Sequence, residues 1–172
     1  MIIVCFSHAG ENYNVGTVDE GNTAKTADLI AERTGCGIVR IVSDTPYPSD
    51  YTAATRVAQD EANRQARPAI TLEGDVDALD SDNTVLLGYP IWWGDAPMPV
   101  YSFLESRDWE GKTIHPFCTH EGSGLGDSVA SIADATDADI QPGLAIRGTD
   151  AQRDTTKTAR LVDAWLERSG LL

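Results

Sequence analysis

Short apolar runs alternate with amphipathic segments along this chain, and this alternation narrows the possible folds more than any other feature. Continuous apolar runs are typical of strands that are buried on both faces of a parallel sheet. Strands interleaved with helices favour the α/β class, here one doubly wound, five-stranded parallel sheet. We expect strands at residues 2–6, 38–42, 84–89, 113–118 and 144–147, and helices at 22–34, 49–67, 100–106, 125–135 and 155–168.

The length of 172 residues suits one domain, and no repeat, low-complexity tract or linker divides the chain. We therefore expect a single domain over residues 1–172. Residues 73–83 are acidic and are predicted to form a loop. The odd set Cys5, Cys36 and Cys118 lacks metal-ligand spacing, which is typical of free thiols in a reducing compartment.

The charge balance is strongly acidic, with 27 acidic and 13 basic residues and a formal net charge of −14. Such a surface repels phosphates, so nucleic acid and anionic membranes are excluded as expected partners. It favours partner proteins with basic patches. Solubility alone, as in a salt-rich cytoplasm, also explains it. No signal segment or apolar stretch of roughly 18 residues is found, so we expect a cytoplasmic protein.

Ligands of open α/β sheets bind beyond the carboxyl ends of the strands, near the point where the strand order reverses. This rule selects three loops, at residues 7–23, 90–99 and 119–127. They are the loops richest in Gly, Ser, Thr, Asn and aromatic residues. We therefore expect them to form one site.

The first loop ends in Gly21, Asn22 and Thr23 at the start of a predicted helix. These residues either cap the helix or leave its N–H groups and positive dipole end free for a phosphate. The hydroxyl of Ser7 would add a neutral donor. No Arg or Lys lies between Ser7 and Gly21, and G-x-x-x-x-G-K-[ST] is absent, so one phosphate fits better than a triphosphate.

The other two loops suit a flat ligand. Trp92 and Trp93 follow a predicted strand and stand beside Gly94, where they either line a ligand or fold back over the sheet edge. The glycine-rich loop 119–127 either brings backbone N–H groups close to a ligand or is a flexible turn. His120 and Glu121 are acid–base candidates without a partner in sequence, and a solvated histidine is the alternative. Together the three loops suit a flat aromatic ligand with one phosphate, and FMN fits this description best.

Three segments resemble the flavodoxin family, specifically a flavodoxin-like branch with an enlarged phosphate loop: FSHAGENYNVG with GNT, GYPIWWGDAPMP, and PFCTHEGSGLGDS. Ordinary flavodoxins join the serine and GNT directly, whereas thirteen residues, 8–20, separate them here. The resemblance implies strand order 2-1-3-4-5 and noncovalent FMN, with Ser7, Asn22 and Thr23 at the phosphate. The candidate cofactor-binding residues are Ser7, Ala9, Gly21, Asn22, Thr23, Pro90, Ile91, Trp92, Trp93, Gly94, Thr119, His120, Gly122, Ser123 and Gly124.

The predicted function is that of a flavodoxin-like redox protein that carries electrons through its flavin to and from basic partner proteins. The alternatives are an FMN-dependent NAD(P)H oxidoreductase that resembles quinone reductases, and a regulatory domain that binds a ligand but no flavin. No residue is assigned a catalytic role.

Overall fold

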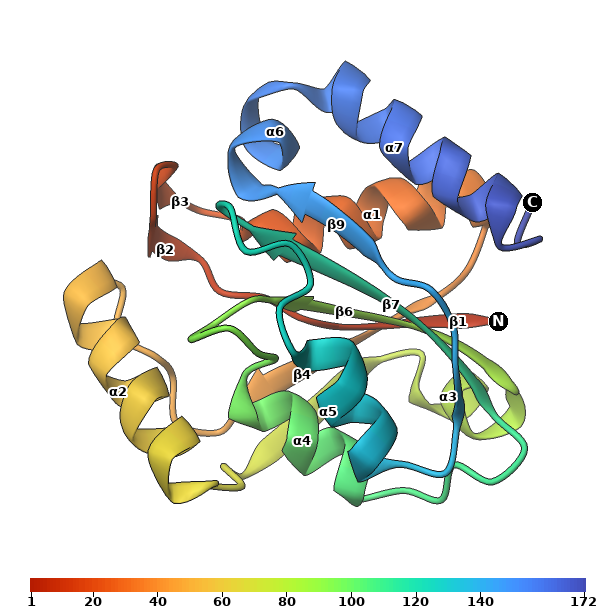
Figure 1. Ribbon diagram of the computed structural model, residues 1–172, viewed down its shortest axis with the longest axis horizontal. Helices are drawn as coiled ribbons and strands as arrows, with labels where there is room; N and C mark the ends of the chain where they lie inside the picture. Colours follow the sequence, from red (N-terminus) through yellow and green to blue (C-terminus); the bar gives the residue numbers. More distant parts are fainter.

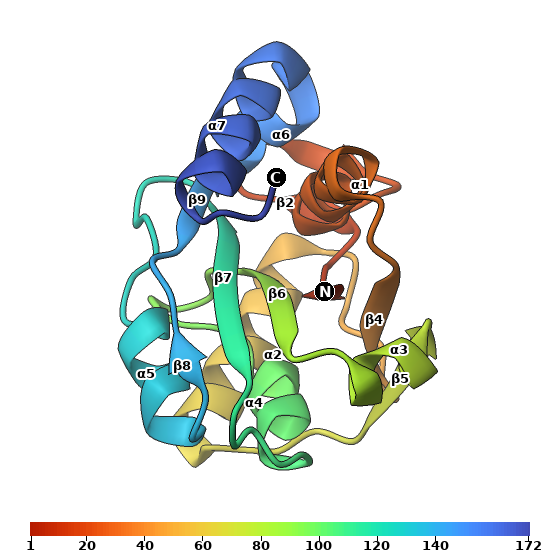
Figure 2. The same cartoon turned by 90° about the vertical axis from the view of Figure 1, so that its right-hand side faces the viewer.

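The computed structural model describes residues 1–172 as three layers, with a central sheet covered by helices on both faces (Figure 1). Figure 2 shows α1, α6 and α7 on one face and α2, α4 and α5 on the other. The helices are α1 (Asn22–Thr34), α2 (Tyr51–Arg64), α3 (Val76–Ser81), α4 (Met98–Glu105), α5 (Ser128–Ala135), α6 (Gly148–Arg153) and α7 (Thr155–Arg168). None of them combines the length and apolar character that crossing a bilayer requires.

The sheet confirms the predicted order 2-1-3-4-5 for its parallel strands. Its full order is β5-β4-β1-β6-β7-β8, and β9 also pairs with β7. The strands are β1 (Ile2–Phe6), β4 (Ile38–Ser43), β5 (Ile70–Gly74), β6 (Thr84–Pro90), β7 (Thr113–His120), β8 (Asp139–Ile140) and β9 (Leu144–Arg147). All pairings except β4–β5 are parallel, so β1, β6 and β7 end at the same edge of the sheet.

The sheet is larger than the five strands expected. The fifth parallel strand is split into β8 and β9, and β5 adds an antiparallel edge strand beside β4. The predicted loop at 73–83 is wrong in part, because it contains the end of β5 and the short helix α3. Only one residue of α3, Leu79, is buried, so the segment carries little apolar signal.

Both faces of the central strands are buried, which explains their continuous apolar sequence. Along β1, Ile3 and Cys5 pack in the cluster that contains Trp165 of α7. Ile2 and Val4 belong to the opposite cluster, which contains Phe103 of α4. The two cores fix the sheet rigidly and therefore fix the loops at its carboxyl edge.

The thirteen residues between Ser7 and Gly21 form an element of their own. Strands β2 (Gly10–Asn12) and β3 (Gly16–Val18) pair antiparallel as a hairpin outside the main sheet. Figure 1 shows this hairpin rising beside the start of α1, on the side of α2. The enlarged loop is therefore ordered structure at the carboxyl edge of the sheet.

Candidate functional site

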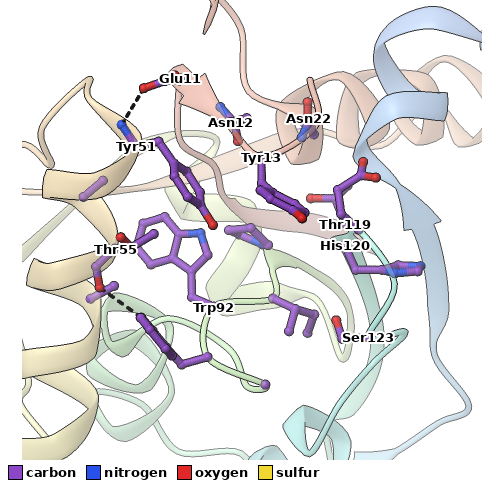
Figure 3. A pocket seen from close by; sticks show the side chains of 17 residues that line it. Glu11, Asn12, Tyr13, Asn22, Tyr51, Thr55, Trp92, Thr119, His120 and Ser123 are labelled. Atoms are coloured by element: carbon purple, nitrogen blue, oxygen red, sulfur yellow. Dashed lines mark hydrogen bonds between the residues drawn. The ribbon is translucent and has the colours of Figure 1, made fainter. Parts of the chain in front are cut away.

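A pocket of about 330 Å³ opens at the carboxyl edge of the sheet (Figure 3). Its size lies within the range of small-molecule sites. Its walls come from the β2–β3 hairpin, the starts of α1 and α2, and the segments 90–94 and 119–123 that follow β6 and β7. The three predicted loops therefore meet in one site, as the topology rule requires.

Most of the predicted site residues line this pocket. Those that line it are Asn22, Pro90, Ile91, Trp92, Trp93, Gly94, Thr119, His120 and Ser123. Those that do not are Ser7, Ala9, Gly21, Thr23, Gly122 and Gly124. In this second group, Ser7, Gly21 and Thr23 shape the start of α1, Gly122 and Gly124 shape the turn after β7, and Ala9 is an exposed residue between β1 and β2.

The start of α1 is open toward an anion. Its N-cap, Gly21, makes no side-chain cap, and the first turn contains no acidic residue. The Ser7 hydroxyl accepts a hydrogen bond from the Ala24 N–H at 3.0 Å. The N–H groups of Asn22 and Thr23 have no acceptor within the helix, and they lie at its positive end. A Cβ at Gly21 would lie 2.3 Å from the Ser7 hydroxyl oxygen, so this close approach requires glycine.

The Thr23 hydroxyl is engaged within the protein. Its Oγ1 lies 2.7 Å from the Oγ1 of Thr119, and both residues are buried. The backbone N–H of Thr23 is therefore the group that a ligand can reach. The same hydrogen bond ties the start of α1 to the end of β7.

The tryptophan loop is a tight turn. Trp93 and Gly94 both have positive φ, at 53° and 83°. Trp92 and Asp95 exchange backbone hydrogen bonds of 2.9 and 3.2 Å, which is typical of a two-residue hairpin turn. The Gly94 carbonyl also accepts a hydrogen bond from the Asp127 N–H at 2.8 Å, which connects this turn to the loop after β7. A bulky residue such as Trp93 at positive φ is strained, and such strain gathers at functional sites.

The two tryptophans have different surroundings. Trp92 packs edge-on against Phe6, His8 and Tyr47, with ring centroids 5.5, 5.8 and 5.0 Å away. Trp93 is 56% exposed, and its Nε1–H donates to the Thr55 carbonyl at 3.0 Å. Trp92 is thus supported from behind while it lines the pocket, whereas Trp93 stands at the rim.

His120 and Glu121 do not form an acid–base pair. The Nδ1 of His120 accepts hydrogen bonds from the N–H groups of Gly122 and Gly124, at 2.8 and 3.1 Å. Nδ1 therefore carries no proton, and burial followed by the charge of Arg147 lowers the pKa of the ring. Oε1 of Glu121 accepts from the Thr149 N–H at 2.6 Å and so caps the start of α6. Both side chains hold the loop in shape.

Part of the pocket wall was not among the named candidate residues, although its hairpin residues lie within the predicted loop 7–23. Its members come from the hairpin and from α2: Glu11, Asn12, Tyr13, Tyr51, Ala54, Thr55 and Ala58. Ligands are also expected beyond the carboxyl end of β4, which is the second strand of the main sheet along the chain. Applying the rule there would have selected the start of α2. The turn-forming pair of Asn14 and Gly16, both at positive φ, is the signal for the hairpin.

The fold and the pocket define an α/β protein whose ligand crevice lies at the carboxyl edge of a doubly wound sheet. A family model described as flavodoxin matches residues 17–168, and the chain belongs to the flavodoxin family. No curated protein sequence matches the chain.

Several solved structures share the fold. A protein described as a flavoprotein from Bacteroides eggerthii is 27% identical, with a TM-score of 0.74 over 96% of this chain and 95% of that one. A Lactobacillus acidophilus flavoprotein in complex with FMN is 21% identical, with a TM-score of 0.62 over 90% and 95%. A Fusobacterium nucleatum flavodoxin bound to flavin mononucleotide is 10% identical, with a TM-score of 0.54 over 98% and 96%. The last two likenesses show the fold alone.

Proposed function

We propose that the protein binds FMN noncovalently in this pocket and carries electrons. The observation that carries the proposal is the meeting of two features at one pocket: a helix start whose first two N–H groups have no acceptor within the helix, and an aromatic turn. The Thr23–Thr119 hydrogen bond joins them. The family supports it, since the Lactobacillus and Fusobacterium proteins of the same fold contain FMN.

The phosphate of FMN would lie at the start of α1. The N–H groups of Asn22 and Thr23 and the helix dipole would hold it, and no carboxylate in the first turn opposes it. Neutral donors suit a single phosphate, because they stabilise the anion without the cation cluster that a triphosphate needs. The Ser7 hydroxyl already accepts a hydrogen bond from the Ala24 N–H, so Ser7 would support the phosphate site by holding the start of α1 in place.

The ring end of FMN would lie against the loops that follow β6 and β7. Trp92 offers an aromatic surface that Phe6 and Tyr47 hold in place, and Trp93 covers the rim. Bound FMN supplies the redox chemistry, and the protein supplies position and electrostatics. The net charge of −14 disfavours further negative charge on the bound ring and attracts basic redox partners.

The carrier function is compatible with the way His120 and Glu121 are engaged within the protein. His120 has its Nδ1 bound by two backbone N–H groups, and Glu121 caps α6. A substrate-specific reductase that needs proton transfer from a side chain would have to release one of them. Electron transfer through a held ring needs neither.

The test is an anaerobic reductive titration of the FMN-loaded protein, with NADH and NADPH tried as reductants beside dithionite. We expect two resolved one-electron stages with dithionite and slow reduction by either nicotinamide. A single two-electron step together with rapid bleaching by NADH or NADPH would contradict the carrier function and favour an NAD(P)H oxidoreductase.

A further inference from the structure

The β2–β3 hairpin places an aromatic side chain over the pocket. Tyr13, at its tip, lines the pocket and is 57% exposed. Its ring stacks on that of Tyr51 from the first turn of α2, with centroids 5.8 Å apart and planes at 29°. Figure 3 shows both rings reaching into the pocket, near Trp92. A large exposed aromatic pair at a pocket mouth needs an explanation beyond packing.

The hairpin is braced on the α2 side. The Glu11 N–H donates to the Ser49 carbonyl at 2.8 Å, and the Glu11 carboxylate accepts from the Tyr51 N–H at 2.9 Å. One residue thus ties the hairpin to the helix that carries Tyr51. These two hydrogen bonds hold the hairpin and the start of α2 together, and with them the two stacked tyrosines.

The hairpin is braced on the opposite side as well. Arg153 of α6 donates to the Val15 carbonyl at 2.8 Å, and the Val15 side chain is buried. Tyr13 is therefore fixed in position while its ring stays accessible. An aromatic group that is positioned in advance loses little conformational freedom when a ligand stacks on it.

We infer that Tyr13, backed by Tyr51, forms a second aromatic wall that holds the isoalloxazine ring of FMN across the pocket from the 90–94 turn. The inference rests on the proposed function and extends it to residues of the enlarged loop. A flat ring suits this side of the pocket, because the stacked tyrosines offer an aromatic surface there. The thirteen-residue enlargement then serves to bind the cofactor ring.

Riboflavin separates contact with the ring from contact with the phosphate, because it has the same ring and no phosphate. The experiment measures the dissociation constants of FMN and riboflavin for the apoprotein, by quenching of flavin fluorescence. The variants are Tyr13→Ala, Tyr13→Leu and Tyr13→Phe. Thr17→Ala is the matched control, since Thr17 is an exposed residue of the same hairpin that does not line the pocket.

We expect Tyr13→Ala and Tyr13→Leu to weaken both flavins by the same factor, at least about fivefold, as for the loss of an aromatic stacking partner. Tyr13→Phe should bind both like the wild type, because it keeps the stacking surface. Thr17→Ala should also bind like the wild type. Circular dichroism of each variant confirms that the sheet is intact.

Two results overturn the inference while leaving the proposed function in place. In the first, the wild type binds FMN and neither Tyr13→Ala nor Tyr13→Leu changes the affinity. In the second, Tyr13→Phe weakens FMN alone, which would assign the hydroxyl to the phosphate. If the wild type binds neither flavin, the proposed function fails first and the inference fails with it.

Discussion

The hydroxyls of Thr23 and Thr119 meet at 2.7 Å in a buried hydrogen bond that joins the first turn of α1 to the end of β7. One end of the proposed cofactor site is thereby coupled to the other. The pairing needs two hydroxyls at once, since each buried oxygen has the other as its side-chain partner. It explains why both positions carry threonine rather than an isosteric valine.

We predict that Thr119→Val lowers the free energy of unfolding by about 1–3 kcal/mol, because it leaves the buried Thr23 hydroxyl without a partner. The double variant Thr23→Val/Thr119→Val should recover most of the loss. Urea denaturation of the apoprotein measures both effects. If the loss in the double variant equals the sum of the losses in Thr23→Val and Thr119→Val, the two hydroxyls do not interact.

Alanine substitutions of the two tryptophans should have similar effects on FMN affinity and different effects on the stability of the apoprotein. Trp92→Ala and Trp93→Ala should each weaken FMN binding by roughly 1–3 kcal/mol if both contact the ring. Trp92→Ala should also destabilise the apoprotein by about 2 kcal/mol or more, because Phe6, His8 and Tyr47 lose a packed neighbour.

Trp93→Ala should change the stability by about 0.5 kcal/mol or less, since Trp93 is largely exposed. Titration with FMN and thermal unfolding of the two apoproteins give the comparison. Unchanged FMN affinity in both variants would show that the aromatic turn is not a cofactor wall.

Asn22→Asp should move stability and FMN affinity in opposite directions. A negative charge in the first turn of α1 interacts favourably with the helix dipole, so the apoprotein should gain about 0.3–1 kcal/mol. The same charge should repel a phosphate held by the N–H groups of that turn. FMN binding should weaken while riboflavin binding stays unchanged, and an equal loss for both flavins would place the phosphate elsewhere.

The stability should also depend on pH through His115. Burial lowers its pKa from the ordinary value of 6.5, against the opposing charge of Asp139. The unfolded chain therefore takes up this proton more readily than the folded protein. The stabilising contribution is complete above pH 6.5 and is lost as the pH falls through the lower, folded-state value.

His115→Phe removes this titrating group. Its free energy of unfolding relative to the wild type should rise as the pH falls from about 7.5 to about 5. Denaturation of the two apoproteins at matched pH values measures the difference. A difference that stays constant over this range would rule out His115 as a source of the acid sensitivity.

The sequence predicted the parallel sheet and three walls of the pocket because their signals are local. The apolar runs mark strands buried on both faces, and α1 and α7 end where their periodicity ends. The carboxyl-end rule then brought Asn22, Trp92 and Thr119 together without knowledge of any contact.

The features that the sequence did not predict depend on contacts between distant segments. Strand β5 is short and at an edge, with an acidic end that is typical of a loop. The hairpin is positioned by Ser49 and Arg153, which are far from it in sequence, and nothing in residues 10–18 specifies those partners. Engagement of the Thr23 hydroxyl by Thr119 is likewise visible only in three dimensions.

The visible absorption spectrum of the purified protein, followed by addition of FMN at micromolar concentration and gel filtration, tests the central claim most directly. The proposed function predicts a yellow protein with the two visible bands of an oxidised flavin, and FMN that elutes with the protein in a ratio near one to one. A colourless protein that retains no FMN would contradict it.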